Sequence, residues 1–223
     1  MMKKENGFSQ RALCCTLILA LSAALLLTGC SPAAPEGYSF APEPTDRRRV
    51  LPVEYSTSKT PNDIEERSEF MELILSGKFL GNTDFYIRGE WIIATGLFEV
   101  ETVYKGSFEK KYIEVEYVGG FIPLDIYMVQ QTQCRADLSA YDHIPAEERA
   151  DWYIEQRVQG PVSKPEPGKS YLLLPSLTSS QEYMVRDDNY DMLPMQDGKA
   201  YDYSTGAYTT FSFMNSADDN PAE

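Results

Sequence analysis

Two runs of alternating residues near the middle of the chain constrain its fold more than any other feature. Trp91–Tyr104 and Tyr112–Val118 carry β-branched and aromatic residues with a period of two, which is the spacing of side chains along a β-strand. Lys105–Ser107 separates the two runs and contains a glycine, so it provides a turn. The sequence therefore predicts a long antiparallel hairpin with apolar side chains inward and with Glu114 and Glu116 facing solvent.

A further strand is expected before this hairpin, although the segment Met71–Leu80 has two interpretations. It either continues a helix to a stop at Gly77 or forms a strand with alternate side chains on one face. Helical periodicity fails after Phe70 and alternation begins there, so we favour the strand. The residues that would share its buried face are Leu73, Leu75, Gly77 and Phe79.

The C-terminal third contains more strand signals. Ser170–Leu174 has the continuous apolar run of a buried strand, and Glu182–Arg186 is its expected antiparallel neighbour. Asp197-Gly198 is a tight-turn pair between the strands expected over Asp191–Met195 and Lys199–Tyr203. These signals predict that strands continue almost to the end of the chain.

Two short helices are predicted around the strands. The first begins with Thr60 as N-cap and Pro61 at the first helical position, with Asp63 near the positive end of the helix dipole. The second is an amphipathic helix over Pro145–Val158, inside an irregular excursion over Phe121–Lys169. The predicted fold class is therefore mainly β, with one or two short peripheral helices.

The N-terminus has the composition of an export signal. Lys3, Lys4 and Arg11 form a basic start, and Ala12–Leu27 is an apolar run shorter than the roughly 20 residues that a membrane-spanning helix needs. The run ends at small residues rather than at a basic stop-transfer flank. Cleavage before Cys30 is therefore expected.

The residues Leu27–Cys30, which read Leu-Thr-Gly-Cys, resemble the lipobox of bacterial lipoproteins, in which the cysteine sulfur is acylated before the signal is cut. The resemblance implies that Cys30 is the lipid-attachment residue and that the chain is anchored at the cell membrane, on its extracytoplasmic face. Two or three acyl chains make a stable tether, because each buried methylene contributes about 0.8 kcal/mol. The alternative is an ordinary cleaved signal or a signal anchor in which Cys30 is incidental.

Four regions follow from these signals. Residues 1–29 are the predicted lipoprotein signal peptide, and residues 30–55 are the lipid anchor and a proline-rich linker. The prolines of Ser31–Pro52 favour an extended spacer over a packed element. Residues 56–214 are the predicted β domain, and residues 215–223 are a polar, disordered tail.

The charge of the expected mature chain excludes one class of partner. Removal of residues 1–29 takes away three basic residues and one acid, which leaves 17 basic and 33 acidic residues and a net charge of −16. Nucleic acid is therefore not an expected partner, since Arg47–Arg49 is the only basic cluster. Besides Cys30 the mature chain keeps only Cys134, so no intramolecular disulfide is expected.

Four short segments carry a family resemblance: Phe98–Ser107, Ile113–Val115, Gly119-Gly120 and Gly168–Leu174. They resemble segments of a group of poorly characterised cell-surface lipoproteins of Gram-positive bacteria, over residues 63 to 203. This resemblance implies a small antiparallel barrel of OB type, like that of netrin-like modules and tissue inhibitors of metalloproteases. Barrels of this type commonly bind ligands on one sheet face and its adjacent loops.

Candidate catalytic residues are few. His143 is the only histidine, which excludes multi-histidine zinc sites, and no nucleophile elbow, phosphate-binding loop or dinucleotide fingerprint is present. Cys134 and His143 would be the nucleophile and base of a thiol enzyme if the fold brought them together. A lone, partly buried thiol is the commoner case, so no catalytic residue is assigned.

A calcium site is weighed because Asp187, Asn189 and Asp191 have the spacing of the first ligands of a calcium loop. The sixth position holds Met192 where glycine is needed, and the twelfth holds Gly198 where a bidentate glutamate belongs. A hand-type loop is therefore excluded, and a looser surface site among Asp187, Asp188 and Asp191 is the alternative to a solvated turn. No metal and no cofactor are predicted.

Several tyrosines crowd the C-terminal third of the chain. One interpretation is that they line a binding face, which stacks on sugar rings or packs against a peptide strand. The other is that they are half-buried strand residues, and we favour this one. These residues are Tyr183, Tyr190, Tyr201, Tyr203 and Tyr208.

The tether and the lack of a catalytic motif together predict a non-catalytic binding or scaffolding module at the cell envelope. Its expected partner is an envelope protein or a glycan held on an exposed sheet face, and its contact with the membrane is the lipid on Cys30. The alternative is an extracytoplasmic hydrolase that uses unrecognised carboxylates or the Cys134 and His143 pair. A pocket that holds two close acids would favour that alternative.

Overall fold

The computed structural model describes residues 33–56, 63–134, 137–159, 162, 164–185 and 190–215. The chain divides into two units, Met1–Pro35 and Glu36–Glu223, and every helix and strand of the described residues belongs to the second. The helical segments are η1 (Arg47–Arg49), α2 (Ile64–Phe70), α3 (Leu124–Gln133), η2 (Ser139–Tyr141), η3 (Ala146–Asp151) and α4 (Ser212–Asn215). The strands are β1 (Val50–Ser56), β2 (Ile74–Arg88), β3 (Trp91–Lys105), β4 (Tyr112–Val118), β5 (Gly120–Pro123), β6 (Tyr153–Gln159), β7 (Ser170–Leu173), β8 (Ser176–Leu177), β9 (Tyr183–Met184), β10 (Met192–Gln196), β11 (Lys199–Asp202) and β12 (Ala207–Thr209).

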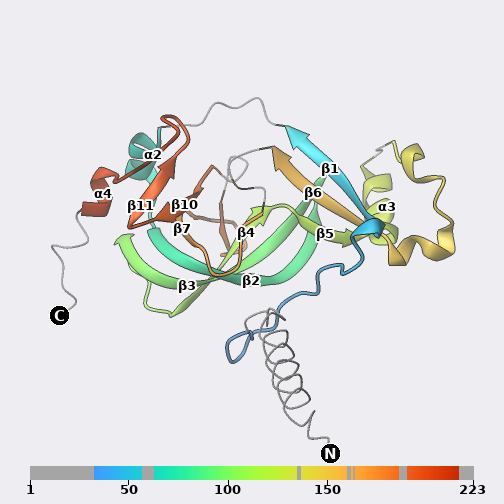
Figure 1. Cartoon of the computed structure of the whole chain (residues 1–223), viewed down its shortest axis with the longest axis horizontal. Helices are drawn as coiled ribbons and strands as arrows, with labels where there is room; N and C mark the ends of the chain where they lie inside the picture. The colour runs from blue at the N-terminus through green and yellow to red at the C-terminus, as the bar shows by residue number, and fades with distance from the viewer. Residues whose placement is uncertain are drawn as a thin grey trace, which may run out of the picture. The chain divides into compact units, whose positions relative to one another are not determined.

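The strands β2 and β3 form a long, curved antiparallel pair that runs through the middle of the second unit (Figure 1). β4 continues from β3 and pairs with it from Tyr112 to Val118, which confirms the hairpin predicted from alternation. The strand favoured for Met71–Leu80 is also confirmed, although it begins at Ile74 and extends to Arg88. Local periodicity was sufficient for this prediction because one face of each strand is buried.

The described strands are arranged in two sheets. The larger has the order β12-β11-β10-β7-β2-β3-β4-β9-β8, and the smaller has the order β1-β6-β5. The prediction of a mainly β fold is confirmed. The small closed OB-like barrel is not what these strands form, because the edge strands β12 and β8 of the large sheet do not pair with each other in the described part of the chain.

The smaller sheet corrects two predictions. β1 and β6 pair in parallel, with Val50 opposite Tyr153, so Val50–Ser56 is a paired strand and not part of an extended spacer. The helix predicted over Pro145–Val158 is wrong as well, since only η3 is helical there and β6 follows it. Pairing with a strand about a hundred positions away decided the conformation of this segment over its local pattern.

Two details of the C-terminal strands were predicted with different success. The Asp197-Gly198 turn joins β10 to β11, and both residues have the positive φ that such a turn requires. Glu182–Arg186 was expected beside Ser170–Leu174, but this is wrong. β9 pairs in parallel with β4, whereas β7 lies between β2 and β10.

The helix α2 begins later than predicted. Its N-cap is Asp63, whose side chain accepts hydrogen bonds from the backbone N–H groups of Glu65 and Glu66. Thr60 and Pro61, which were expected at this position, lie outside the described residues.

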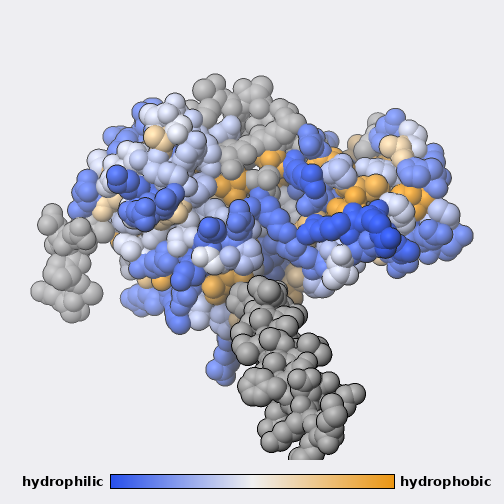
Figure 2. All heavy atoms as spheres, in the orientation of Figure 1, coloured by the Kyte–Doolittle hydropathy of each residue, from blue (hydrophilic) through white to orange (hydrophobic). Residues whose placement is uncertain are grey.

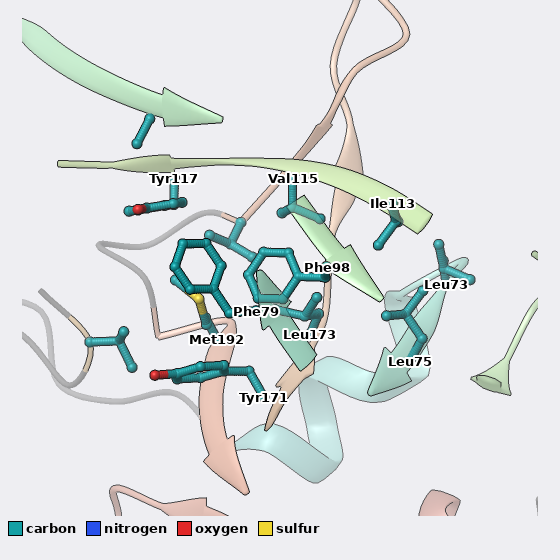
Figure 3. Packing of buried hydrophobic residues seen from close by; sticks show 13 residues of the cluster. Leu73, Leu75, Phe79, Phe98, Ile113, Val115, Tyr117, Tyr171, Leu173 and Met192 are labelled. Atoms are coloured by element: carbon teal, nitrogen blue, oxygen red, sulfur yellow. The ribbon is translucent and has the colours of Figure 1, made fainter. Parts of the chain in front are cut away.

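An aromatic layer occupies the centre of the core, between β4 and the strands that face it (Figure 3). The rings of Phe79 and Phe98 have centroids 5.2 Å apart, and Phe98 meets Tyr171 edge-on at 6.3 Å. Gly96 lies against these rings, since a Cβ there would be 3.0–3.2 Å from atoms of Phe98, Phe79 and Tyr117. The absence of a side chain at Gly96 therefore allows the rings to pack closely.

Alternate residues of β2 and β7 point to the opposite face of the large sheet. Ile74 and Leu172 are buried there, under Ile64 of α2 and under Phe211 and Met214 near the C-terminus. The segments α2 and α4 thus cover this face.

The smaller sheet packs against one end of the β2–β3 pair through a separate apolar cluster. Its buried members are Ile92, Ile122, Leu124, Ile144 and Ile154. In the view of Figure 2 most of the surface is hydrophilic, while apolar residues show around α3. The helix α3 itself buries Leu124 and exposes Ile126 and Val129.

Candidate functional site

The predicted lipid-attachment residue Cys30 lies outside the described residues, as do the signal peptide and the tail after Asn215. Cys134 is exposed at the end of α3, and its Sγ contacts the carbonyl oxygen of Gly89 at 3.8 Å. His143 is exposed on the loop between η2 and η3, and no hydrogen bond or ion pair among the described residues joins it to Cys134. The structure therefore does not assemble the thiol–imidazole pair.

Of the candidate calcium ligands, only Asp191 lies within the described residues. It is fully buried and pairs with Arg67, whose Nη2 lies 2.5 Å from Asp191 Oδ2. A guanidinium at this distance makes the carboxylate a poor cation ligand. No group of three or more potential metal ligands occurs in the part of the chain that the structure describes.

The tyrosines of the C-terminal third fall into two places. Four of them form a chain of edge-on contacts, in which Tyr201 lies 5.0 Å from Tyr203 and 5.2 Å from Tyr208, and Tyr190 lies 6.0 Å from Tyr203. Tyr183 lies elsewhere, on β9. The four residues thus contact one another, while Tyr203 also packs against the core cluster of Ile74 and Leu172 and Tyr208 stays exposed.

Tyr183 instead lines a groove of about 270 Å³ beside β4, which we call the Glu116 groove. Most of its wall residues are aromatic or charged. They are Tyr38, Phe108, Tyr112 and Tyr183, with the carboxylates Glu114, Glu116 and Glu182, the cation Lys110, and Thr95, Ile113 and Gln181.

Glu116 is the buried acid of this groove, with only 3% of its surface exposed. Its Oε1 accepts hydrogen bonds from the Tyr86 hydroxyl and from Nη2 of Arg88, the latter at 2.9 Å. Its Oε2 is buried and has no hydrogen-bond partner in the described part of the chain. An unpaired buried carboxylate oxygen is costly, and this atom has no surface open to the groove.

The groups behind Glu116 are both hydrogen-bond donors to its carboxylate. Burial raises the pKa of Tyr86, and the hydrogen bond to Glu116 raises it further, so Tyr86 is a neutral donor at neutral pH. Burial lowers the pKa of Arg88, but its hydrogen bond and charge interaction with Glu116 outweigh burial and raise it overall. Arg88 Nη2 also lies 3.5 Å from Glu182 Oε2, so one guanidinium connects two carboxylates of the wall.

The groove exists because β9 is much shorter than β4. β3 pairs with all of β4, whereas β9 pairs only opposite Val115 and Glu116. The Val185 N–H donates to the Glu116 carbonyl, so the backbone polar groups of Glu116 point toward β9. The direction of these groups alternates along a strand, so those of Tyr112 point to the same edge of β4. The edge of β4 next to Tyr112 therefore borders the groove instead of a neighbouring strand.

A second hollow of about 540 Å³ adjoins the first, and we call it the Phe70 hollow. Its walls combine two exposed apolar side chains, Phe70 at 77% and Leu177 at 41% exposure, with several polar residues. Gln181 and Tyr183 belong to the walls of both hollows, so the two adjoin at the β8–β9 hairpin. The remaining wall residues are Met71, Glu72, Leu73, Ser107, Pro175, Ser176 and Thr178.

The residue at this junction has a strained backbone. Gln181 has a φ of 65°, in the left-handed region that disfavours residues other than glycine. The turn is held by bonds from Gln181 N–H to the Thr178 carbonyl and from Thr178 N–H to the Glu182 carbonyl. Strain of this kind clusters at ligand-binding segments, which agrees with the position of Gln181 between the hollows.

Sequence reasoning missed Glu116 because strict alternation placed it on a solvent-facing side of β4. It does lie on the side opposite Ile113, Val115 and Tyr117, but Tyr86, Arg88 and β9 cover it. No local signal marks such a residue, because its cover comes from segments 28 or more positions away.

Comparisons of this chain with protein-family models, with curated proteins and with solved structures find no match. Within the described ranges, no helix combines the length and the apolar character needed to cross a membrane.

Proposed function

We propose that this protein is a membrane-anchored, extracytoplasmic lipoprotein that acts as a non-catalytic binding module at the cell envelope and holds its ligand in the Glu116 groove. The observation that carries the proposal is the open groove itself, which is walled by aromatic rings and by three carboxylates, one of them the buried Glu116. Binding sites commonly combine apolar walls with a few fixed polar groups of this kind.

The location rests on the N-terminal sequence. The basic start, the apolar run and the Leu27–Cys30 motif support acylation of Cys30. The resemblance to Gram-positive surface lipoproteins supports the same location, while the open sheets offer no argument from an OB barrel.

Two further features support an envelope partner over nucleic acid. The chain carries a net charge of −14. Each arginine of the Arg47–Arg49 cluster has an acidic neighbour, with Arg48 at 2.9 Å from Asp46 and Arg49 at 2.9 Å from Asp151. Arginines paired in this way attract phosphates less than free ones.

A hydrolase is the second candidate, because Arg88 brings the carboxylates of Glu116 and Glu182 to one wall. Two carboxylates beside one guanidinium do not by themselves define a reaction, so binding is the first proposal. Assays with chromogenic glycosides and peptide amides separate the two candidates. Turnover that is lost in both Glu116→Gln and Glu182→Gln would replace the binding proposal.

The anchoring is tested by metabolic labelling with radioactive palmitate. We expect label on the wild-type chain and none on Cys30→Ser, which would remain unprocessed. Unlabelled wild-type protein would overturn the proposed anchor.

The groove is tested by photocrosslinking in cells. Tyr112 is replaced by p-benzoylphenylalanine, and Tyr208, an exposed tyrosine outside the groove, receives the same replacement as the matched control. We expect a defined crosslinked product from position 112 only, reduced at least fivefold by Glu116→Gln. Equal products from both positions, or none at position 112, would contradict binding in this groove.

A further inference from the structure

The second unit of the chain begins close to the proposed lipid-attachment residue. Its first residue is Glu36, six positions after Cys30. A fully extended chain spans at most about 3.6 Å per residue, so these six positions reach about 20 Å at most. Of the segment predicted as a linker, residues 30–55, only the part before Glu36 is left to act as a spacer.

The residues that follow are packed on the strands of the second unit. The Ala41 N–H donates to the Asn82 carbonyl oxygen of β2 at 2.7 Å. The ring of Phe40 lies against Gly81, where a Cβ would be 2.9 Å from two of its atoms. Pro44 is buried. This segment is therefore part of the folded unit, although its prolines had suggested an extended spacer.

Charged side chains attach the same segment at further points. Nζ of Lys164 lies 2.6 Å from Oε2 of Glu43. The Arg47 guanidinium lies 3.7 Å from Glu155 of β6 and 5.1 Å from the centroid of the Phe121 ring of β5. Each such contact is weak alone. Together with the buried proline, however, they would all have to break before the spacer could lengthen.

The spacer is short compared with the unit that it carries. A compact unit of roughly 190 residues has a diameter of about 40 Å, which is about twice the reach of the spacer. The far side of such a unit cannot turn to the lipid surface, because the spacer would have to run around the unit. In Figure 1 the second unit begins at the bottom of the view, while β11 and the turn after it lie at the upper left.

The side on which the unit begins carries tyrosines and lysines. Tyr38 meets Tyr112 edge-on at 5.8 Å, so the start of the unit lies beside the loop that leads into β4. Lys110 and Lys111 of this loop are exposed, and Lys111 Nζ is 5.1 Å from the centroid of the Tyr112 ring. Tyrosine and lysine suit the headgroup layer of a membrane, because each has an apolar body and a polar tip.

We propose that this face, made of Tyr38, Lys110, Lys111 and Tyr112, rests at the lipid headgroups and that the acyl chains on Cys30 hold it there. The inference rests on the anchoring proposed above. Tyr38, Lys110 and Tyr112 also line the Glu116 groove, so the groove opens beside the bilayer. A ligand of the groove then has to reach the layer next to the membrane.

The spacer, and not attraction to charged lipid, sets this orientation. The chain carries a net charge of −14, which gives no overall attraction to anionic headgroups. The same face should therefore lie toward neutral and anionic membranes alike.

The test measures energy transfer from the protein to the lipid surface. The acylated chain is purified in detergent and reconstituted onto phosphatidylcholine vesicles that carry an acceptor dye on their headgroups. The exposed Cys134 is replaced by serine in every sample. The donor dye is attached to Glu109→Cys, next to Lys110, or to Ala207→Cys at the exposed start of β12, which is the matched control.

We expect energy transfer from position 109 to be at least twofold stronger than from position 207, and equally so in vesicles that contain phosphatidylglycerol. A second chain carries about 20 glycine and serine residues inserted between Pro35 and Glu36, which add an average span of about 25 Å. The insertion precedes the second unit and leaves its contacts in place. It should reduce the difference between the two positions at least twofold.

The contrary outcomes are distinct. Equal transfer from positions 109 and 207 in the acylated chain, or no change on insertion, would overturn the inference while the anchor stands. A difference that occurs only with phosphatidylglycerol would show that lipid charge, and not the spacer, orients the unit. A wild-type chain without palmitate would overturn the anchor and this inference together.

Discussion

Arg88 and Glu116 form an ion pair across the intervening strand β3, with Nη2 and Oε1 2.9 Å apart, although the two residues are 28 positions apart in sequence. Their environments differ, because the Glu116 side chain is 5% exposed whereas that of Arg88 is 42% exposed. The two partners should therefore contribute unequally to stability.

We expect Arg88→Met to destabilise the protein by about 3–5 kcal/mol, because it leaves a buried carboxylate without its counter-ion. Glu116→Gln should cost about 1–3 kcal/mol, because the arginine that remains reaches solvent. Urea unfolding followed by circular dichroism measures both. A larger loss for Glu116→Gln than for Arg88→Met would contradict this account of the pair.

Alkaline pH should weaken the fold through its buried tyrosines. Burial raises the pKa of Tyr117 far above its usual value, and its hydrogen bond to Asn82, at 2.7 Å, only partly opposes this. Below about pH 10 the phenol is neutral in both the folded and unfolded states, so its ionisation does not lower the free energy of unfolding. Above about pH 10 only the unfolded chain loses the proton, so stability should fall by about 1.4 kcal/mol per pH unit for this residue.

The measurement is the free energy of unfolding between pH 8 and pH 12, with tyrosine ionisation followed by ultraviolet absorbance. Tyr117→Phe removes the titrating group and should make the slope shallower, at a cost of about 1 kcal/mol for the lost hydrogen bond. The pKa values of other phenols are also raised by burial, so a residual slope should remain. These phenols belong to Tyr86, Tyr141, Tyr171 and Tyr203. An unchanged slope in the variant would exclude Tyr117 as a source.

The Arg67–Asp191 pair should act as a structural link between α2 and the start of β10. Asp191 is fully buried and the Arg67 side chain is 13% exposed. We expect Asp191→Ala to cost about 3–5 kcal/mol in a thermal or urea unfolding experiment. Asp151→Ala, which breaks the exposed pair with Arg49, is the matched control and should cost at most about 1 kcal/mol. Similar losses in the two variants would show that burial does not set the contribution of these pairs.

Gly120 should resist substitution for two separable reasons. Its φ is 115°, and a Cβ at this position would lie 2.5 Å from the ring of Phe85. We expect Gly120→Ala to lower the free energy of unfolding by about 3 kcal/mol or more, from backbone strain and a clash in a packed region. Gly198→Ala also has a positive φ, but its 74° lies near the left-handed region that other residues visit, and no atom lies within 4 Å of the added Cβ, so it should cost only about 1 kcal/mol. Equal costs would exclude the clash with Phe85.

Local sequence was a good guide where one short segment carried the whole signal. The alternation in β3 and β4 and the Asp197-Gly198 turn each depend on neighbours within a few residues, and all three are confirmed. The segment Pro145–Val158 carried an ambiguous signal, and its parallel pairing with β1 decided in favour of strand β6. Propensity is a weak influence when a neighbouring strand can satisfy the backbone hydrogen bonds of a segment.

The candidate site was beyond local reasoning, because it is assembled from Tyr38, β4 and the β8–β9 hairpin. Alternation correctly placed Glu116 on the side of β4 away from the aromatic core, but whether that side meets water depends on what lies over it. Tyr86, Arg88 and β9 cover it, and the shortness of β9 leaves the groove open.

The sequence by itself determined the mainly β character, the hairpin at the centre of the large sheet and the acidic charge, since these follow from side-chain periodicity and composition. The tertiary structure alone decided which strands became neighbours, that the sheets stay open instead of closing into a barrel, and that one glutamate is buried beside a groove. The physical reason is that burial and hydrogen bonding depend on contacts between segments far apart in the chain, whereas periodicity reports only which side of a strand each residue occupies.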